Sequence, residues 1–370
     1  MASERIRVGV IGVGWGSMVL APAFRAVPEY ELAAICSRRP ERVAEAGAAL
    51  GIEDTSTDWE SFVRRDDLDV IAVCTPTDLH HDQTIAALRA GKDVMCEKPV
   101  ALTVEQARRM LEVAQETGRR HAVNFEGRWL PDRYALWELV KQGYLGDPYL
   151  ARVQTLGELW HPSRKLQSEW MYKVDEGGGY LMGLSSHDID YLCALFGRPV
   201  AVSADVRTTV PTRTRPDGSV LEVTADDTST LLIRFESGVH ASIATSMVAL
   251  GVDQRRVELF GSEGALTLDG VLMGTPEQAT LEGYRLDGQG KSALALSERR
   301  VRSGAVIPSR RAGSAILALA LMLEDWLPSF EGRPTPGVPD LHDGWVTQTV
   351  VEAARRSSNG AGWVDLTAGD

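Results

Sequence analysis

The sequence has little of what marks several common protein classes. Its four cysteines show no paired spacing, which argues against a zinc site and a disulfide framework. Lysine and arginine number 39 against 51 acidic residues, a balance that disfavours nucleic acid or an anionic membrane as partner. The apolar run AILALALML, at 315–323, falls short of the roughly 20 residues of a membrane span, and MASERIRVGVIG is not built like a secretion signal. We therefore expect a cytoplasmic protein with no metal, membrane or nucleic-acid partner.

What the sequence does contain is enough apolar residues, 44% of 370, for two hydrophobic cores. In its first third, short apolar runs alternate with helical stretches, the pattern of repeated βαβ units and a parallel sheet. One of these stretches has clear end signals, because Thr103 and Gln106 form a capping-box pair and Gly118 suits a left-handed C-cap. We predict a Rossmann dinucleotide-binding domain over residues 1–124, with strands at IRVGVIG, YELAAIC, DVIAVC, KDVMCE and RHAVNF.

From about residue 148 the apolar residues recur with period two, and few helices intervene. This pattern predicts an α+β domain over residues 125–370 with an open, mainly antiparallel sheet, so the whole chain is of the α/β class. The run ASIATSMVAL is apolar on both faces, which suggests that the sheet face away from the core is also covered. A homodimer or homotetramer through that open face is the simplest cover. The strands are predicted at PYLARVQTLGELW, AVSADVRTTV, TSTLLIRF, HASIATSMVAL, RRVELFG and ALTLDG.

A glycine turn, GVGWGS at 12–17, directly follows the first predicted strand. Gly12 permits a tight turn, and Gly14 lets backbone N–H groups approach a pyrophosphate at the start of the next helix. The third fingerprint position is Ser17, with Gly16 one place early. Because the motif sits in a βαβ array, we interpret it as a dinucleotide site that includes Trp15 of the turn.

The end of the second strand indicates which dinucleotide is bound. An NAD site usually has an acidic residue there for the ribose 2′-OH, whereas this chain reads Ser37, Arg38, Arg39 and, after Pro40 and Glu41, Arg42. Arginines at a helix N-terminus are unfavourable unless an anion is near, and a 2′-phosphate would be such an anion. We predict NADP, with NAD possible; the alternative is a solvated basic turn.

Four motifs together resemble one known family. GVGWG, CTPTDLHHDQTIAALRAGKDVMCEKP, EGGGYLMGLSSHDID and the ending EDWLPSFEGRPTP with DGWVTQTVVEAARRSS are similar to the glucose-fructose oxidoreductase and inositol dehydrogenase (Gfo/Idh/MocA) family, from Ile6 to about Leu366. The resemblance implies a Rossmann domain followed by an open-sheet domain. It also implies oxidation or reduction of a hydroxyl or carbonyl group on a sugar or cyclitol with NAD or NADP.

The resemblance also implies roles for individual residues. Lys98 corresponds to the family's catalytic lysine, which would stabilise a developing alkoxide, and His187 corresponds to its general acid/base. Otherwise, Lys98 would be a surface lysine and His187 a histidine packed between domains. A cis peptide bond is expected between Lys98 and Pro99. The remaining implied positions are Thr75, Pro76 and His80 beside the nicotinamide, Glu97 near the cofactor's ribose, and Arg128, Trp129 and Trp170 near the substrate, although tryptophans are more often core or interface residues.

One position departs from the family pattern. Members usually read GGGxLxDxGxH, with an aspartate four residues before the histidine, and this chain has Gly183 there. The loss of a carboxylate would leave the imidazole less basic and less firmly oriented, and it opens volume beside the substrate. Asp188, Tyr180 and Glu126 are candidates to fill the gap. We therefore count Gly183 and Asp188 among the predicted substrate contacts.

Two functions from different classes remain open. The first is an NADP-preferring oxidoreductase that acts on a sugar, cyclitol or glycoside, either releasing the cofactor each turnover or keeping it bound. The second is a cofactor-binding sensor or regulatory protein that has lost turnover. Retention of both Lys98 and His187 favours the enzyme.

Overall fold

The computed structural model describes residues 5–272, 275, 278–288, 290–305, 307 and 311–366. The chain forms two compact units, and each contains two separate stretches of sequence. The first unit is Met1–Trp129 with Arg299–Trp345, and the second is Leu130–Glu298 with Val346–Asp370. The sequence suggested one change of domain, after residue 124, and did not indicate that 299–345 returns to the first unit.

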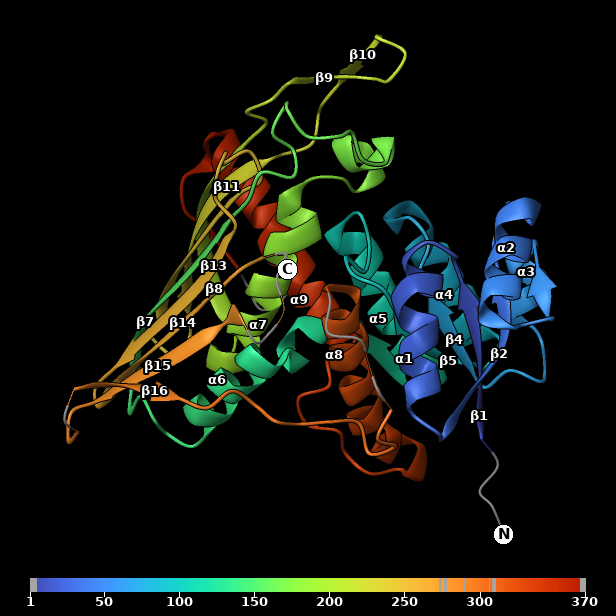
Figure 1. The fold of residues 1–370 in the computed structure, drawn as a ribbon, viewed down its shortest axis with the longest axis horizontal. Helices are drawn as coiled ribbons and strands as arrows, with labels where there is room; N and C mark the ends of the chain where they lie inside the picture. The colour runs from blue at the N-terminus through green and yellow to red at the C-terminus, as the bar shows by residue number, and fades with distance from the viewer. Residues whose placement is uncertain are drawn as a thin grey trace. The chain divides into compact units, whose positions relative to one another are not determined.

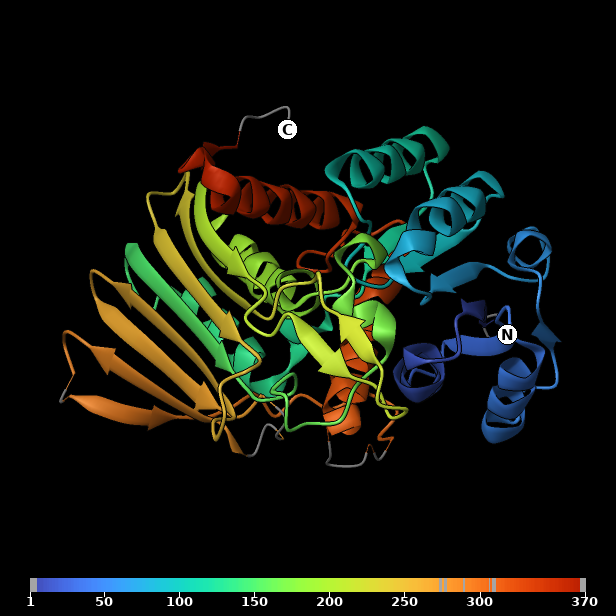
Figure 2. The same cartoon turned by 90° about the horizontal axis from the view of Figure 1, so that it is seen from above.

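The first unit is built on a six-stranded sheet in which every pairing is parallel, in the order β3-β2-β1-β4-β5-β6. The five predicted strands are all present, and β3 is a two-residue addition. Helices lie on both faces of this sheet, as Figure 2 shows. The strands are β1 Ile6–Ile11, β2 Tyr30–Cys36, β3 Thr55–Ser56, β4 Val70–Val73, β5 Asp93–Cys96 and β6 His121–Val123.

The helices of the first unit begin and end at residues suited to those positions. Asp58 accepts hydrogen bonds from the first N–H groups of α3, and Thr103 accepts one from Gln106 N at the start of α5, as predicted. Gly51 and Gly118 end α2 and α5 in the left-handed conformation. The helices are α1 Ala21–Ala26, α2 Pro40–Leu50, α3 Trp59–Val63, α4 His80–Arg89, α5 Val104–Thr117 and α8 Arg311–Trp326; α9, Leu341–Arg356, also begins in this unit (Figure 1).

The apolar helix α8 accounts for the return of the chain to the first unit. Tyr30 Oη donates a hydrogen bond to Leu323 O at 3.3 Å, and Trp129 Nε1 donates to Asp325 Oδ2 at 2.8 Å. By length and composition Ala312–Glu331 could cross a membrane, but 56% of its most apolar window is buried inside the structure. That burial is typical of the core helix of a globular protein.

The second unit is built on a nine-stranded sheet in the order β16-β15-β14-β13-β7-β12-β11-β8-β17. Its pairings are antiparallel except between β7 and β12, so the predicted open, mainly antiparallel sheet is confirmed. The strands are β7 Pro148–Leu156, β8 Pro199–Arg207, β11 Thr228–Phe235, β12 His240–Ser246, β13 Gln254–Gly261, β14 Gly264–Gly270, β15 Thr280–Arg285, β16 Lys291–Leu294 and β17 Val364–Asp365; β9 Thr212–Thr214 and β10 Val220–Glu222 form a separate hairpin.

One face of this sheet carries the core of the second unit. Helices α6, Pro131–Lys141, and α7, Ser186–Phe196, cover it together with the second half of α9 (Figures 1 and 2). Apolar side chains from these helices pack against alternate residues of β7, β11, β12 and β13. The sheet therefore provides a rigid base for α7, the helix that carries His187.

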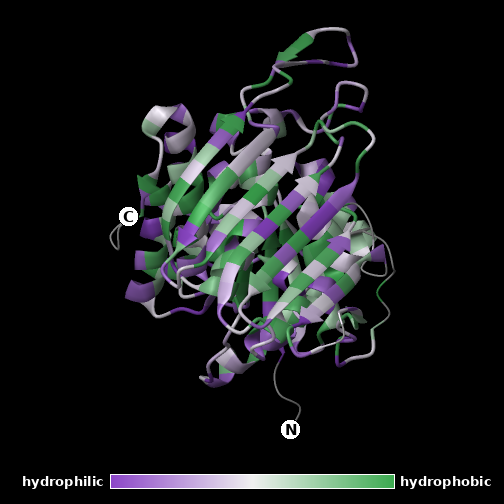
Figure 3. Cartoon of the chain, turned by 90° about the vertical axis from the view of Figure 1, so that its left-hand side faces the viewer, coloured by the Kyte–Doolittle hydropathy of each residue, from purple (hydrophilic) through white to green (hydrophobic). Residues whose placement is uncertain are grey.

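Figure 3 shows hydrophobic and hydrophilic residues mixed along the strands of this sheet, and the less buried residues of each strand belong to the face away from the core. Along β12 its residues are His240, Ser242, Ala244 and Ser246, which are small or polar. Leu150 and Leu232 are the exposed leucines on neighbouring strands, at 41% and 46% exposure. The run that reads as apolar on both faces is thus apolar toward the core and mostly small on the other side.

Candidate functional site

The carboxyl ends of the parallel strands bring the predicted cofactor residues of the first unit to one edge of the sheet. The strand order reverses between β1 and β4, because β2 lies on one side of β1 and β4 on the other. Ligands of such sheets bind at this switch point, outside the carboxyl ends. Gly12 follows β1, Thr75 follows β4 and Lys98 follows β5, so all three lie at this edge.

The three glycines of the turn after β1 are suited to their positions for different physical reasons. Gly12 has φ +106°, and a Cβ there would lie 2.0 Å from Cys74 O. A Cβ at Gly16 would lie 3.1 Å from Val10 Cγ1, whereas at Gly14, which is exposed, it would meet nothing within 4 Å. Gly14 therefore leaves open space over the turn, which fits the close approach of a pyrophosphate.

The helix after this turn starts differently from the expected α-helix. Gly16–Leu20 is a π-helical turn, and α1 follows it. The Ser17 hydroxyl donates a hydrogen bond to Val13 O at 2.6 Å, so it stabilises the turn itself, while Trp15 is half-buried. A single π turn of this kind is frequent at functional sites.

The end of β2 presents a basic surface. Ser37 is half-buried, and its N–H donates to Ser56 O at 3.0 Å. Arg38, Arg39 and Arg42 are exposed at the start of α2, and none forms an ion pair with a carboxylate of the described residues. With Glu41 as the acid of the first turn, these three arginines leave an excess of positive charge at the N-terminus of α2, where an anion would be stabilised.

In the loop after β5, hydrogen bonds of the neighbouring residue Glu97 fix the backbone at Lys98. Glu97 is buried; its carboxylate accepts a hydrogen bond from Asn124 Nδ2 at 2.6 Å and another from Lys98 N at 3.1 Å. Burial raises the pKa of Glu97, and the Lys98 charge opposes that rise. The Lys98–Pro99 peptide bond is cis, as predicted. Lys98 is half-buried between buried neighbours, which leaves its side chain accessible at the edge of the sheet.

His80 connects the loop after β4 with the loop after β5, which carries Lys98. It is 1% exposed, with Nδ1 at 2.9 Å from Pro99 O and Nε2 at 2.9 Å from Thr75 O. Burial lowers the pKa of His80, so the neutral ring, which can donate from only one nitrogen, is favoured. These contacts give His80 the role of a link between backbone loops, whereas Thr75 and Pro76 remain half-buried at the edge.

In the second unit, two glycines of the segment before α7 lie so close to neighbouring atoms that a side chain would not fit. A Cβ at Gly178 would lie 2.3 Å from Met171 O; Gly179 has φ +99°, and its Cβ would lie 2.3 Å from Asp226 Oδ1. Asp226 Oδ2 accepts a hydrogen bond from Leu181 N at 2.6 Å. Burial raises the pKa of Asp226 to about 6. This aspartate thus holds the start of the helical segment that leads to His187.

The segment that carries His187 begins as a π-helical turn, Leu181–Ser185, and continues as α7. His187 and Gly183 are half-buried, whereas Ser185, Ser186 and Asp188 are buried. A Cβ at Gly183 would meet nothing within 4 Å. Position 183 thus adjoins open space about one helical turn before the histidine.

Several predicted substrate residues are engaged elsewhere. Asp188 is 1% exposed and paired with Arg133 and Arg255, which corrects its assignment as a substrate contact or as a replacement for the missing acid. Arg128 donates to Gly337 O at 3.1 Å and pairs with Asp343.

The two tryptophans differ from each other. Trp129 is 4% exposed and its ring nitrogen donates a hydrogen bond to Asp325, so it takes part, like Arg128, in the packing of the first unit. Trp170, in a 3-10 turn of the second unit, is 36% exposed.

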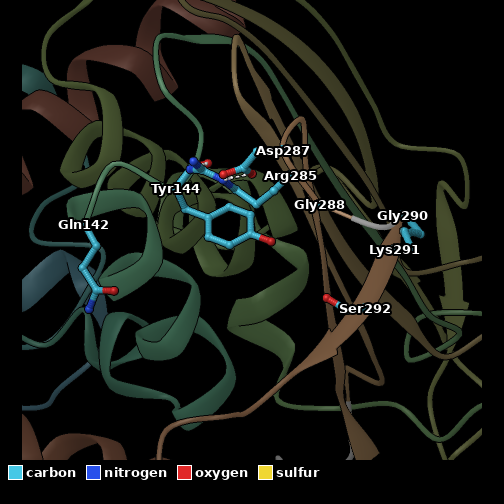
Figure 4. Close-up of a pocket in the computed structure, with 8 residues that line it drawn as sticks. All are labelled: Gln142, Tyr144, Arg285, Asp287, Gly288, Gly290, Lys291 and Ser292. Carbon is cyan, nitrogen blue, oxygen red and sulfur yellow. Dashed lines mark hydrogen bonds and ion pairs between the residues drawn. The ribbon is translucent and has the colours of Figure 1, made fainter.

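The structure also adds residues that the sequence did not indicate. Asn124 and Asp226 each bind a segment that carries a predicted catalytic residue, and neither lies in a motif with a chemical signature. A surface pocket of about 480 Å³ in the second unit, shown in Figure 4, contains none of the predicted site residues. It is lined by Gln142, Tyr144, Arg285, Asp287, Gly288, Gly290, Lys291 and Ser292.

A parallel sheet with a glycine turn at its switch point is the architecture of a dinucleotide-binding domain. Two family models match: "Oxidoreductase family, NAD-binding Rossmann fold" over residues 6–125, and "GFO/IDH/MocA C-terminal domain" over residues 134–267. The chain is 30% identical to myo-inositol 2-dehydrogenase of Thermotoga maritima, over 72% of this chain and 76% of that protein. The chain belongs to the Gfo/Idh/MocA family of oxidoreductases.

Levoglucosan dehydrogenases are also similar to this chain. The enzyme of Pseudarthrobacter phenanthrenivorans is 28% identical over 72% of this chain and 74% of that protein. A solved structure of a levoglucosan dehydrogenase in complex with NADH and levoglucosan matches with a TM-score of 0.84 and 25% identity, over 98% of this chain and 99% of that one. The predicted fold, family and enzyme class are thereby confirmed.

Proposed function

We propose that this protein is an NADP-preferring oxidoreductase that transfers a hydride between nicotinamide and a hydroxyl or carbonyl carbon of a sugar, cyclitol or glycoside. The observation that carries the proposal is the accessibility of Lys98 and His187. Each is half-buried between two buried neighbours, Glu97 and Pro99 for Lys98 and Ser186 and Asp188 for His187, and all four neighbours form hydrogen bonds. Relatives named as inositol and levoglucosan dehydrogenases support the substrate class.

The chemistry of this proposal divides between the two side chains. Bound nicotinamide would supply or accept the hydride at the edge that Gly14, Thr75 and Pro76 form. In the direction of oxidation, neutral His187 accepts the hydroxyl proton while the Lys98 cation stabilises the negative charge that develops on that oxygen. In reduction, the imidazolium of His187 returns the proton. Open space at Gly183 favours a substrate with a substituent that an aspartate there would exclude.

The direct test is an absorbance assay at the nicotinamide band with a panel of free sugars, cyclitols and glycosides, each with NADP and NAD. We expect turnover with at least one panel member. Tight NADPH binding without turnover on any member would favour the alternative, a cofactor-binding sensor of the same fold.

The cofactor preference gives a separate prediction. We expect NADPH to bind at least about tenfold more tightly than NADH, because a hydrogen-bonded charge pair contributes on the order of 1.5–3 kcal/mol. Arg38→Ala should weaken NADPH about tenfold and leave NADH unchanged, since only NADPH carries the 2′-phosphate. Fluorescence titration measures both dissociation constants.

Arg207→Ala is the matched control, because Arg207 is exposed and lies on the sheet of the second unit, where it pairs with Asp205. It should change neither affinity. Equal affinities for NADPH and NADH in the unmodified protein would show that the arginines form an ordinary basic turn.

The proposal also includes self-association, as a homodimer or homotetramer, through the outward face of the nine-stranded sheet. The small side chains of β12 and the exposed leucines Leu150 and Leu232 would permit close contact between two such faces. A monomer in sedimentation velocity at micromolar concentration would contradict it.

A further inference from the structure

The carboxylate of Asp188 lies where three elements of the second unit meet. Arg133 Nη2, from α6, donates to Asp188 Oδ1 at 2.6 Å, and Arg255 Nη2, from β13, donates to the same oxygen. Asp188 and Arg133 are each 1% exposed, and the Arg255 side chain is 15% exposed. One oxygen of α7 therefore joins the helix to a second helix and to the sheet.

The contacts of Arg133 strengthen this junction. Its guanidinium lies over the Tyr191 ring, 5.2 Å from the centroid, and Tyr191 Oη donates to Arg133 O at 2.7 Å. Tyr191 lies three residues after Asp188 and thus on the same side of α7. The two helices are therefore linked by an ion pair, a cation–π contact and a hydrogen bond.

The sheet contributes a row of four polar side chains that begins at Arg255, and the other three are buried. Arg255, Thr155, Thr245 and Ser229 are directly opposite one another on β13, β7, β12 and β11. Thr245 Oγ1 accepts a hydrogen bond from Ser185 Oγ at 2.9 Å, just before α7. Polar groups are costly to bury, but once paired they allow only one arrangement of the elements that carry them.

The two arginines depend on this one carboxylate. Among the described residues, Arg133 Nε and Nη1 and Arg255 Nε have no hydrogen-bond partner, and Asp188 is the ion-pair partner of both arginines. Removal of Asp188 would leave the buried Arg133 and the half-buried Arg255 without an ion-pair partner among the described residues, which is strongly unfavourable for the buried charge. The junction therefore requires a negatively charged side chain at position 188.

We propose that Asp188, together with Arg133 and Arg255, is a positioning residue that fixes the rotation and the depth of α7 and so aims the His187 ring. This inference rests on the proposed function, in which His187 transfers the proton. Successive helical residues point about 100° apart, so Asp188 can hold the buried side of α7 while His187 lies half-buried beside it. A shift of about 1 Å in an acid/base group can cost on the order of a hundredfold in rate.

The test uses two variants that should act in opposite directions on His187. Asp188, Arg133 and Arg255 together form a cluster with a net charge of +1. Asp188→Asn keeps the size and an acceptor oxygen of the side chain but changes this charge to +2, whereas Arg255→Met changes it to zero. The other acids on α6 and α7, which are Asp132, Glu138 and Asp190, are unchanged in both variants, as are Arg256 and Glu258 of β13. A more positive cluster makes a nearby imidazole harder to protonate, and a neutral one makes it easier.

In steady-state kinetics, Asp188→Asn should lower kcat about 10- to 100-fold, as expected for a displaced group, with KM and NADPH affinity within about twofold of the unmodified values. The acid limb of the oxidation rate profile should move to lower pH in Asp188→Asn and to higher pH in Arg255→Met. Burial raises the pKa of Asp188 to about 6, against the opposing effect of Arg133. The difference between Asp188→Asn and the unmodified protein should therefore be greatest above pH 6.

Asp227→Asn is the matched control for lost stability. Asp227 is fully buried in the same unit and accepts hydrogen bonds from Thr209 N and Val210 N, neither of which belongs to α7. Its loss should lower the melting temperature without moving the pH limb. The inference is overturned if Asp188→Asn and Arg255→Met shift the limb in the same direction, or if Asp227→Asn reproduces their shifts.

A second measurement separates this inference from the proposed function. NMR titration of the His187 ring in histidine-labelled protein, assigned with the His187→Ala variant, reports the effect of the cluster without any turnover. Opposite shifts of that titration in the two variants, combined with full activity of His187→Ala, would retain the electrostatic junction and reject the acid/base role. Unchanged ring titration in both variants would reject the junction even if His187→Ala is inactive.

Discussion

His187→Ala lowers turnover by about 10²- to 10⁴-fold, the usual contribution of a positioned acid/base, while the dissociation constant for NADPH changes little. Turnover and NADPH affinity are expected to respond differently because the predicted cofactor site belongs to the first unit, whereas His187 belongs to α7 of the second. That cofactor site consists of the glycine turn, the basic end of β2 and the loops after β4 and β5. Single-turnover absorbance at saturating cofactor measures the chemical step, and fluorescence titration measures binding. The lost rate should appear in kcat more than in KM, because proton transfer occurs only in the transition state.

His240→Ala controls for the loss of a histidine, because His240 is exposed on the sheet face opposite α7. Gly183→Asp is the complementary variant. A Cβ there meets open space, so the carboxylate fits one turn before His187 and should favour the imidazolium, moving the acid limb of oxidation to higher pH. Full turnover in His187→Ala would show that the proton leaves through another group. Loss of substrate binding in Gly183→Asp would show that the glycine makes room for a bulky substrate.

The strands that carry the cofactor site could be predicted because their signals are local. Each run from IRVGVIG to RHAVNF contains at least three apolar residues, and glycines flank three of the strands: Gly12 after β1, Gly91 before β5 and Gly118 before β6. The pairing of Arg299–Trp345 with the first unit could not be predicted in the same way. It depends on where the apolar side of α8 finds a complementary surface, nearly 300 residues from Tyr30 along the chain. Periodicity identifies a helix but not the surface against which it packs.

In the candidate site, too, residues in motifs could be predicted, whereas partners distant in the sequence could not. Lys98 and His187 were identified through motifs, and their accessibility agrees with a role in chemistry. Asp188, next to His187 in sequence, was expected at the substrate, yet it is buried because successive helical residues point in different directions and Arg133 and Arg255 approach from other elements. The partners of Arg128 and Trp129 could not be predicted for the same reason, since they lie about 200 residues later.

Lys98→Met is expected to lower kcat by about 10²- to 10³-fold, the cost of removing one preorganised group that stabilises a developing oxyanion. Methionine keeps the unbranched side chain and removes the charge, so the loop held by Glu97 and Asn124 should retain its hydrogen bonds. Lys98→Arg, which keeps a positive charge in a bulkier and planar form, should recover part of the loss. Lys141→Met serves as the control, because Lys141 is an exposed lysine at the end of α6.

The pH profile distinguishes the electrostatic role of Lys98 from proton transfer by Lys98 itself. If the cation only stabilises the oxygen, Lys98→Met lowers the plateau of the profile, and the acid limb assigned to His187 remains. If Lys98 is instead the proton acceptor, that limb disappears in Lys98→Met and persists in His187→Ala. Turnover of Lys98→Met within about threefold of the unmodified enzyme would contradict both roles. The fixed charge would then have to come from a different residue, and the loop between β5 and α5 would serve only to bind the cofactor.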